Sequence, residues 1–85
     1  MATPSWFIEI FQVTSMEKQQ EVLRFLQRTP RLTALGTFRG DDYFIVFECE
    51  DRATKGSAEV LIEGIDPGSI QTFVTQARRQ LGSSG

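Results

Sequence analysis

Histidine is absent from this chain of 85 residues, and cysteine occurs once, at Cys49. Without histidine, the chain lacks the side chain that most often moves protons near neutral pH and that most often binds transition metals. A single cysteine can form neither a disulfide within the chain nor a metal site of several thiolates. The sequence therefore argues against histidine-based catalysis and the usual metal centres, and it indicates no cofactor.

Long apolar runs and a strong net charge are also missing. No stretch approaches the roughly 20 apolar residues that span a membrane, and the opening residues MetAlaThrProSer lack the basic segment and apolar core of a secretory signal. The formal net charge is only −2, so the chain as a whole does not attract nucleic acid or an anionic membrane. We expect a cytoplasmic protein with no membrane partner.

Length and composition indicate one small folded domain. Hydrophobic residues make up 40% of the chain and charged residues 24%, as in ordinary globular proteins. We expect a single domain over residues 1–81 and a flexible tail at residues 82–85, GlySerSerGly. A chain of this length buries a modest core, so association with a second copy is a natural source of added stability.

An internal near-repeat is the strongest structural signal. Residues 6–11, TrpPheIleGluIlePhe, are echoed by residues 43–48, TyrPheIleValPheGlu, and Pro30 and Pro67 are separated by the same 37 positions as the two segments. Self-similarity at such a period is typical of two copies of one supersecondary unit. We therefore expect the two halves of the chain to fold alike.

The first half predicts the order strand, helix, strand, strand. Thr14 and Glu17 have the spacing of a capping box at a helix start, apolar residues then recur at helical spacing, and Pro30 ends the helix. Strands are expected at residues 6–13, 32–38 and 43–50. Residues 39–42, ArgGlyAspAsp, form a hairpin turn, which explains the two adjacent aspartates better than acid–base catalysis does.

The last third admits two interpretations. In the first, Asp51 caps a helix that ends near residue 65, residues 66–69 turn, and residues 70–75 form a fourth strand. In the second, residues 57–65 are a strand and a C-terminal helix covers residues 67–81, with a proline in its first turn. The repeat favours the first interpretation, because it aligns Pro67 with Pro30 at a helix-to-strand junction.

The first interpretation corresponds to a two-layer α+β sandwich of the ferredoxin-like type, with the order βαββαβ and a four-stranded antiparallel sheet; the second corresponds to βαβββα. On its duplicated halves and on residues 49–69, CysGluAspArgAlaThr through IleAspProGlySer, the chain resembles small stand-alone ferredoxin-like domains, such as ACT-type regulatory domains and uncharacterised bacterial members. The resemblance implies pairing of two copies, with amino-acid binding at their interface. ValThrSerMet, at residues 13–16, stands where those domains carry a glycine-containing loop.

Alternation along the strands predicts two faces of the sheet. The face under the helices is expected to carry Ile8, Ile10, Leu32, Ala34, Ile45, Phe47, Ile70, Thr72 and Val74. The uncovered face is expected to carry Phe7, Glu9, Phe11, Leu35, Phe44, Val46, Glu48, Phe73 and Thr75. Six of those nine residues are large and apolar, which is typical of an interaction surface. We expect a regulatory or adaptor module that forms a homodimer, or binds another protein, through this face.

Two other functions are compatible with that face. A dimeric α+β barrel enzyme would use the cavity between paired sheets, with Glu9 and Glu48 as its acid–base groups. An RNA-recognition module would stack bases on Phe7, Phe11 and Phe44. The two glutamates oppose RNA binding, and the third strand lacks the basic and glycine residues of that signature.

Charge placement suggests a site for a small anion. Six of the nine cations are expected at one pole of the domain, around the start of the second helix, whose backbone amides add to the positive field. They are Arg28, Arg31, Arg52, Lys55, Arg78 and Arg79. Alternatively, these cations are ordinary solvent-exposed charges on loops and bind no anion. Cys49, late in a strand on the core face, is expected to be a buried apolar residue rather than a nucleophile.

Overall fold

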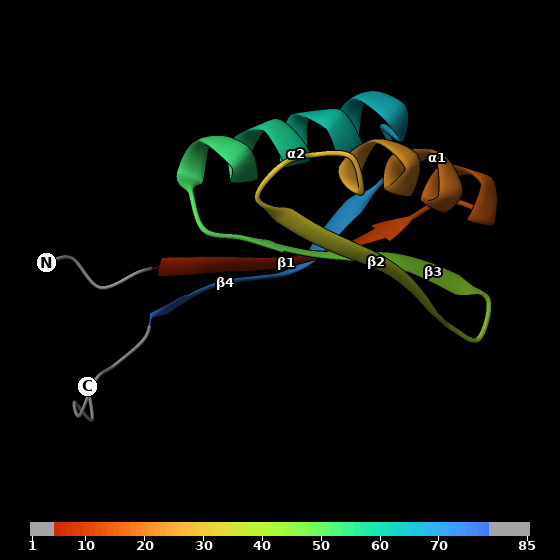
Figure 1. The fold of residues 1–85 in the computed structure, drawn as a ribbon. Helices are drawn as coiled ribbons and strands as arrows, with labels where there is room; N and C mark the ends of the chain where they lie inside the picture. Colours follow the sequence, from red (N-terminus) through yellow and green to blue (C-terminus); the bar gives the residue numbers. More distant parts are fainter. Residues whose placement is uncertain (1–4, 79–85) are drawn as a thin grey trace, which may run out of the picture.

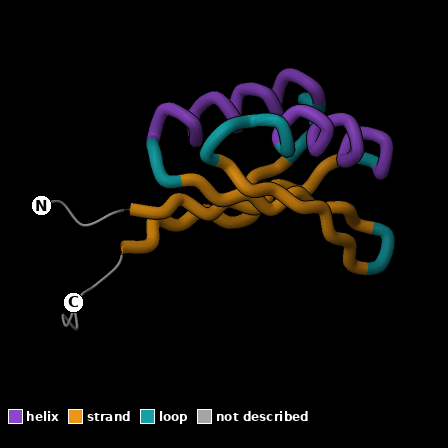
Figure 2. The backbone as a smooth tube through the Cα atoms, viewed as in Figure 1, coloured by secondary structure: helices purple, strands orange, loops and turns teal. Residues whose placement is uncertain are grey.

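The computed structural model describes residues 5–78, which form a four-stranded antiparallel sheet with two helices on one of its faces (Figure 1). The elements are β1 (Ser5–Val13), α1 (Met16–Leu26), β2 (Leu32–Arg39), β3 (Asp42–Cys49), α2 (Arg52–Ile65) and β4 (Ile70–Arg78). The strands lie in the order β2-β3-β1-β4. Figure 2 shows the helices as one layer and the strands as the other, which confirms the predicted two-layer α+β class.

The last third of the chain follows the first of its two interpretations. Residues 52–65 are helical and residues 70–78 form a strand, so the strand at residues 57–65 and the terminal helix over residues 67–81 are wrong. The predicted tail at residues 82–85 lies outside the described residues. Neither described helix has the length and apolar character that crossing a membrane requires.

The turn between β2 and β3 is the tight hairpin that the sequence predicts. Two residues, Gly40 and Asp41, connect the paired ends Arg39 and Asp42. Gly40 has a φ of 63°, which is the backbone conformation that a two-residue hairpin requires at this position. Glycine adopts this conformation without steric cost.

The N-terminus of α1 differs from the predicted capping box. Ser15, not Thr14, caps the helix, and its hydroxyl accepts a hydrogen bond from the Lys18 N–H at 3.1 Å. Thr14 is held elsewhere, because its N–H and hydroxyl donate to the buried carboxylate of Asp66 at 2.7 and 2.9 Å. This contact joins the β1–α1 and α2–β4 connections, 52 residues apart in the chain. The sequence could not reveal it, since Asp66 reads as an ordinary turn residue.

The cap of α2 is the one that the sequence predicts. The carboxylate of Asp51 accepts hydrogen bonds from the Thr54 N–H at 2.9 Å and from the Thr54 hydroxyl at 2.6 Å. These bonds lower the pKa of Asp51. The carboxylate also satisfies one of the backbone donors that a helix start leaves without an intrahelical partner.

The predicted faces of β1 are reversed in the structure. Phe7, Glu9 and Phe11 pair with Cys49, Phe47 and Ile45, and all six are buried under the helices. Ile8 and Ile10 lie on the opposite, uncovered face. β1 is apolar at both alternating sets of positions, so its own sequence cannot choose a face; the register with β3 decides it.

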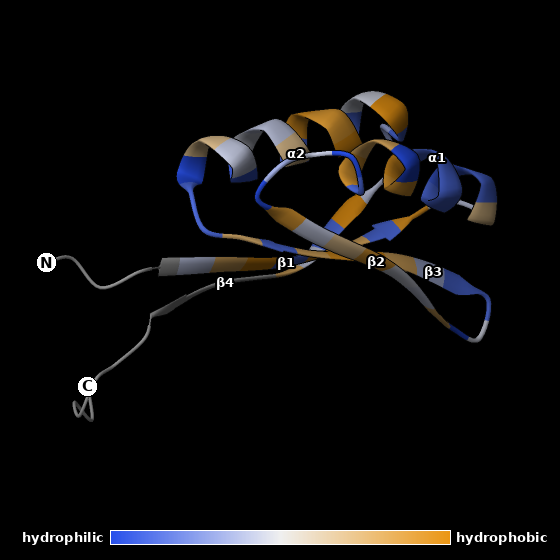
Figure 3. Ribbon diagram, viewed as in Figure 1, coloured by the Kyte–Doolittle hydropathy of each residue, from blue (hydrophilic) through white to orange (hydrophobic). Residues whose placement is uncertain are grey.

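The core fills the space between the sheet and the helices. Its buried apolar members are Phe7, Phe11, Val13, Val22, Leu26, Ile45, Phe47, Cys49, Ala58 and Ile62. The rings of Phe11 and Phe47 stack with their centroids 6.2 Å apart. In Figure 3 apolar positions colour the middle of the sheet and parts of both helices, while hydrophilic positions gather at the β2–β3 turn and at the start of α2.

Helix α1 approaches the sheet closely at a glycine of β2. Gln19 is buried and donates from Nε2 to the carbonyls of Thr37 and Phe44, each at 2.9 Å. A Cβ on Gly36 would lie 2.7 Å from that nitrogen and 2.9 Å from Cδ1 of Leu23. Because Gly36 has no side chain, α1 can lie close enough to the sheet for Gln19 to hydrogen-bond to β2 and β3.

Gly36→Ala should lower the free energy of unfolding by about 1–3 kcal/mol, because the added methyl group displaces the Gln19 amide and overpacks the contact with α1. The matched control is Gly56→Ala within α2, where an added Cβ meets nothing within 4 Å. That substitution should raise the free energy of unfolding by about 0.5–1 kcal/mol. Urea unfolding measures both, and equal effects of the two substitutions would contradict the close approach at Gly36.

Candidate functional site

The uncovered surface of the sheet, called the open face below, carries a broad apolar area. Its described members include Ile8, Ile10, Gln12, Thr33, Leu35, Thr37, Arg39, Asp42, Phe44, Val46, Glu48, Thr72 and Phe73. Thr72 was expected under the helices, and the shift in register between β1 and β4 next to Ile10 accompanies its place on the open face. Two hollows lie on it, of about 420 Å³ around Phe44 and Ile10 and of about 220 Å³ around Leu35 and Ile8. Val46 lines both of them, so the two hollows form one continuous surface.

Nine residues were predicted for this surface; the side chain of Thr75 is outside the described ones, and five of the other eight lie on the open face. They are Leu35, Phe44, Val46, Glu48 and Phe73. Phe73 pairs with Ile10 across β1 and β4 and is 47% exposed, and Leu35 is 52% exposed. The other three, Phe7, Glu9 and Phe11, are under the helices, and Ile8 and Ile10 take their place. The open face is therefore apolar, but β1 contributes Ile8 and Ile10 to it instead of the predicted Phe7, Glu9 and Phe11.

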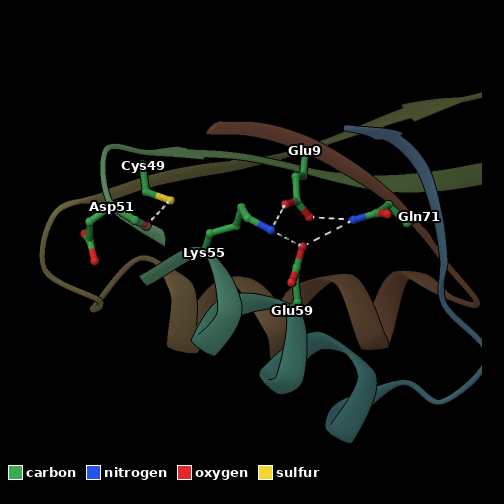
Figure 4. A network of polar contacts seen from close by, with 6 residues as sticks. All are labelled: Glu9, Cys49, Asp51, Lys55, Glu59 and Gln71. Atoms are coloured by element: carbon green, nitrogen blue, oxygen red, sulfur yellow. Dashed lines mark hydrogen bonds and ion pairs between the residues drawn. The ribbon is translucent and has the colours of Figure 1, made fainter. Parts of the chain in front are cut away.

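Glu9 is at the centre of a polar network on the covered side of the sheet (Figure 4). Its side chain is 0% exposed and points from β1 toward Lys55 and Glu59 of α2. The Lys55 Nζ atom lies 3.5 Å from Glu9 Oε2 and 3.2 Å from Glu59 Oε2. Gln71 of β4 donates to Glu9 Oε1 at 2.7 Å. One buried carboxylate thus connects β1, α2 and β4.

The contacts within this network shift the pKa values of Glu9 and Glu59. Burial raises the pKa of Glu9 to about 7, and the hydrogen bond and negative charge of Glu59 add to the increase, while Gln71 and Lys55 oppose it. The pKa of Glu59 is lowered, first by its hydrogen bond with Glu9 and then by Lys55. Near neutral pH, Glu9 is therefore divided between its protonated and charged forms.

A group with a pKa near 7 is suited to acid–base chemistry, but Glu9 lacks access to a substrate. It is enclosed under α2, whereas Glu48 lies on the open face at the opposite side of the sheet. The two glutamates cannot share one pocket, so the predicted acid–base pair of a barrel enzyme is wrong. The same reversal of β1 removes Phe7 and Phe11 from the open face, so of the three rings predicted to stack bases only Phe44 lies there.

The six cations predicted to bind an anion do not share one environment in the structure. Lys55 is engaged by two carboxylates, and its Nζ and the guanidinium of Arg52 lie 5.6 and 5.5 Å from the ring centroid of Phe7. Arg28 and Arg31 are exposed after α1, and the charge of Arg31 contributes to the lowered pKa of Asp51. Arg78 ends β4, and Arg79 lies outside the described residues. Lys55 is therefore not available to an anion, contrary to the expectation.

Sequence reasoning missed Glu59 and Gln71 and misassigned Lys55. One signal was present: Lys55 and Glu59 are four residues apart, which places them on one face of a helix. A glutamate inside an apolar strand needs such a partner if it is buried. Cys49 is buried as expected, and burial raises the pKa of its thiol, which disfavours the nucleophilic thiolate.

The raised pKa of Glu9 predicts a stability that falls as pH rises. The folded protein holds the Glu9 proton more tightly than the unfolded chain, with a pKa of about 7 against an ordinary 4.5. The stabilising contribution is complete below about pH 4.5 and is lost as the pH rises through about 7, for a total of about 3 kcal/mol. Glu59 acts in the opposite direction, because its pKa is lowered in the folded protein: its stabilising contribution is complete above about pH 4.5 and is lost as the pH falls through its lowered pKa.

Glu9→Gln should remove this decline, so urea unfolding at pH 5 and pH 8 should give nearly equal free energies for the variant and unequal ones for the wild type. Glu63→Gln, an exposed position of α2 outside the network, is the control and should retain the wild-type decline. A Glu9→Gln protein with an unchanged pH profile would show that the decline has another source.

Comparisons with known proteins identify a similar fold but no related family. No protein-family model and no curated protein matches the chain. Among solved structures, the chain is similar to a de novo designed protein titled Foldit4, with a TM-score of 0.61 and 13% sequence identity over 89% of this chain and 99% of the designed one. At this identity the similarity shows a shared fold alone.

Proposed function

We propose that this chain is a small non-catalytic binding module of the ferredoxin-like type, which acts in a regulatory or adaptor role by associating through the open face of its sheet. The order βαββαβ with the strands arranged β2-β3-β1-β4 supports the ferredoxin-like assignment. The character of the open face supports association.

The observation that carries the proposal is the apolar content of a surface that no described part of the chain covers. Its large apolar members are Ile8, Ile10, Leu35, Phe44, Val46 and Phe73. They are contiguous across the strands, because Ile10 pairs with both Val46 and Phe73, and Val46 pairs with Leu35. A continuous apolar surface of this kind gains free energy when a partner covers it.

The position of the titratable groups supports binding rather than catalysis. Glu9 has the most suitable pKa but is enclosed, and its neighbours Lys55 and Gln71 are engaged with it. Cys49 is buried and disfavoured as a thiolate. The accessible hollows on the open face are lined mainly by apolar side chains and threonines, which favour contact with a protein surface.

Leu35→Glu tests the proposal, because it places a charge on the open face at a position already half exposed and so leaves the core intact. Sedimentation of the wild type should give a dimer of about 19 kDa, twice the 9.6 kDa of one chain. Leu35→Glu should shift the protein to the monomer.

Val60→Glu is the matched control. Val60 is 72% exposed on α2, on the other side of the molecule, so the same kind of substitution should leave the dimer unchanged. A wild type that sediments as a monomer at all concentrations, or a Leu35→Glu protein that remains dimeric, would contradict association of two copies through this face.

A further inference from the structure

The first turns of α2 are attached to the sheet by charged groups more than by apolar packing. None of residues 52–57 is buried, and the buried side chains of α2 begin at Ala58. The Lys55 Nζ atom of this segment lies 3.5 Å from the buried Glu9 carboxylate and 5.6 Å from the ring centroid of Phe7. The attachment of residues 52–57 therefore depends on the charge of the side chains beneath them.

The other end of α2 is held more firmly. Ile62 is fully buried in the core, and the carboxylate of Asp66, directly after the helix, accepts hydrogen bonds from the N–H and hydroxyl of Thr14. Gly56 lies in the less firmly held segment, and a glycine within a helix lowers the cost of leaving the helical conformation. The first turns of α2 can therefore open while the rest of the helix stays on the sheet.

The polar network beneath this segment contains more carboxylates than cations. Glu9 is 0% exposed, and its Oε2 atom accepts no hydrogen bond from the described residues. Its nearest cation, Lys55, is shared with Glu59, whose Oε2 atom is 3.2 Å from the ammonium. When both carboxyl groups are charged, one ammonium faces two carboxylates at an enclosed site. A proton on Glu9 makes the three groups neutral in sum.

The other groups around Glu9 do not offset the excess carboxylate. From β4, Gln71 contributes a neutral amide, and the side chains that α1 buries are uncharged. From β3, the Cys49 thiol has a raised pKa and stays protonated. Arg52 of α2 lies over the ring of Phe7 and forms no ion pair within the described residues. The pKa of Glu9, raised to about 7, agrees with this arrangement.

We propose that residues 52–57 form a proton-controlled cover, which is closed over the sheet while Glu9 carries a proton and opens locally when Glu9 loses it. Opening admits water to Glu9, so that its charged form is hydrated instead of facing Glu59. Opening also uncovers Cys49, whose buried Sγ atom lies 3.7 Å from the carbonyl oxygen of Asp51 at the start of α2 (Figure 4). The inference goes beyond the proposed function, because it concerns the side of the sheet opposite the open face.

Labelling of Cys49 with a thiol reagent measures the opening, because the chain has no second cysteine. In the open form Glu9 regains an ordinary pKa of 4.5 in place of about 7, so the open population should rise about tenfold between pH 6 and pH 8. Comparison with Glu9→Gln at each pH cancels the pH dependence of the thiolate itself. The ratio of the wild-type labelling rate to the Glu9→Gln rate should therefore rise about tenfold. Glu63→Gln, at an exposed position of α2, should behave as the wild type.

The urea dependence of labelling separates local opening from unfolding of the whole domain. A local opening exposes little surface, so the labelling rate at low urea should change little with urea concentration, whereas labelling through global unfolding rises steeply. Glu59→Gln is a second variant. Because Lys55 then faces Glu9 alone, the increase in labelling between pH 6 and pH 8 should be smaller than in the wild type.

Each part of the proposal can be overturned separately. A ratio of wild-type to Glu9→Gln rates that stays constant between pH 6 and pH 8 would overturn the control by Glu9. Labelling that follows global unfolding at every urea concentration would overturn the local opening. An undiminished increase in Glu59→Gln would overturn the role given to the second carboxylate. None of these results bears on the open face, where Leu35→Glu tests the proposed function.

Discussion

A fully enclosed carboxylate determines how the two layers of this molecule meet. Glu9 is on one of the two central strands, and leaving its charged form unpaired in the interior would cost several kcal/mol. The Lys55 ammonium and the Gln71 amide offset that cost, and they come from α2 and β4. The position of α2 over the sheet and the alignment of β4 beside β1 are thus coupled to one side chain, which no short-range sequence pattern describes.

The burial of Glu9 also explains why the open face is apolar. Side chains alternate along a strand, so placing Phe7, Glu9 and Phe11 under the helices places Ile8 and Ile10 on the other side. A slip of one residue would expose Glu9 and bury the two isoleucines. The observed register instead stacks Phe11 against Phe47, and these large rings fill the core better than isoleucine would. The core therefore holds the larger side chains of β1, and the open face receives its two isoleucines.

Local signals in the sequence predicted what is local in the structure. The hairpin at Gly40, the Asp51 cap and the helix that follows it were all readable from residues within a few positions of one another. The faces of β1 were not readable, because both of its alternating sets are apolar and only pairing with β3 distinguishes them. The long-range partners of Asp66 and Lys55 were also hidden, since Thr14 and Glu9 lie 52 and 46 positions away from them in the chain.

The similarity to a designed protein shows that this fold does not depend on one particular sequence. A sequence only 13% identical adopts a similar fold, so the arrangement of strands and helices does not require the particular residues found here. Exposed Leu35 and Phe73 contribute little to packing within one copy, and a solvated polar side chain would serve the fold at either position. Their apolar character is best explained by a surface that is covered when the protein acts. This reasoning supports the proposal that the specific function lies on the open face and that the enclosed Glu9 network has a structural role.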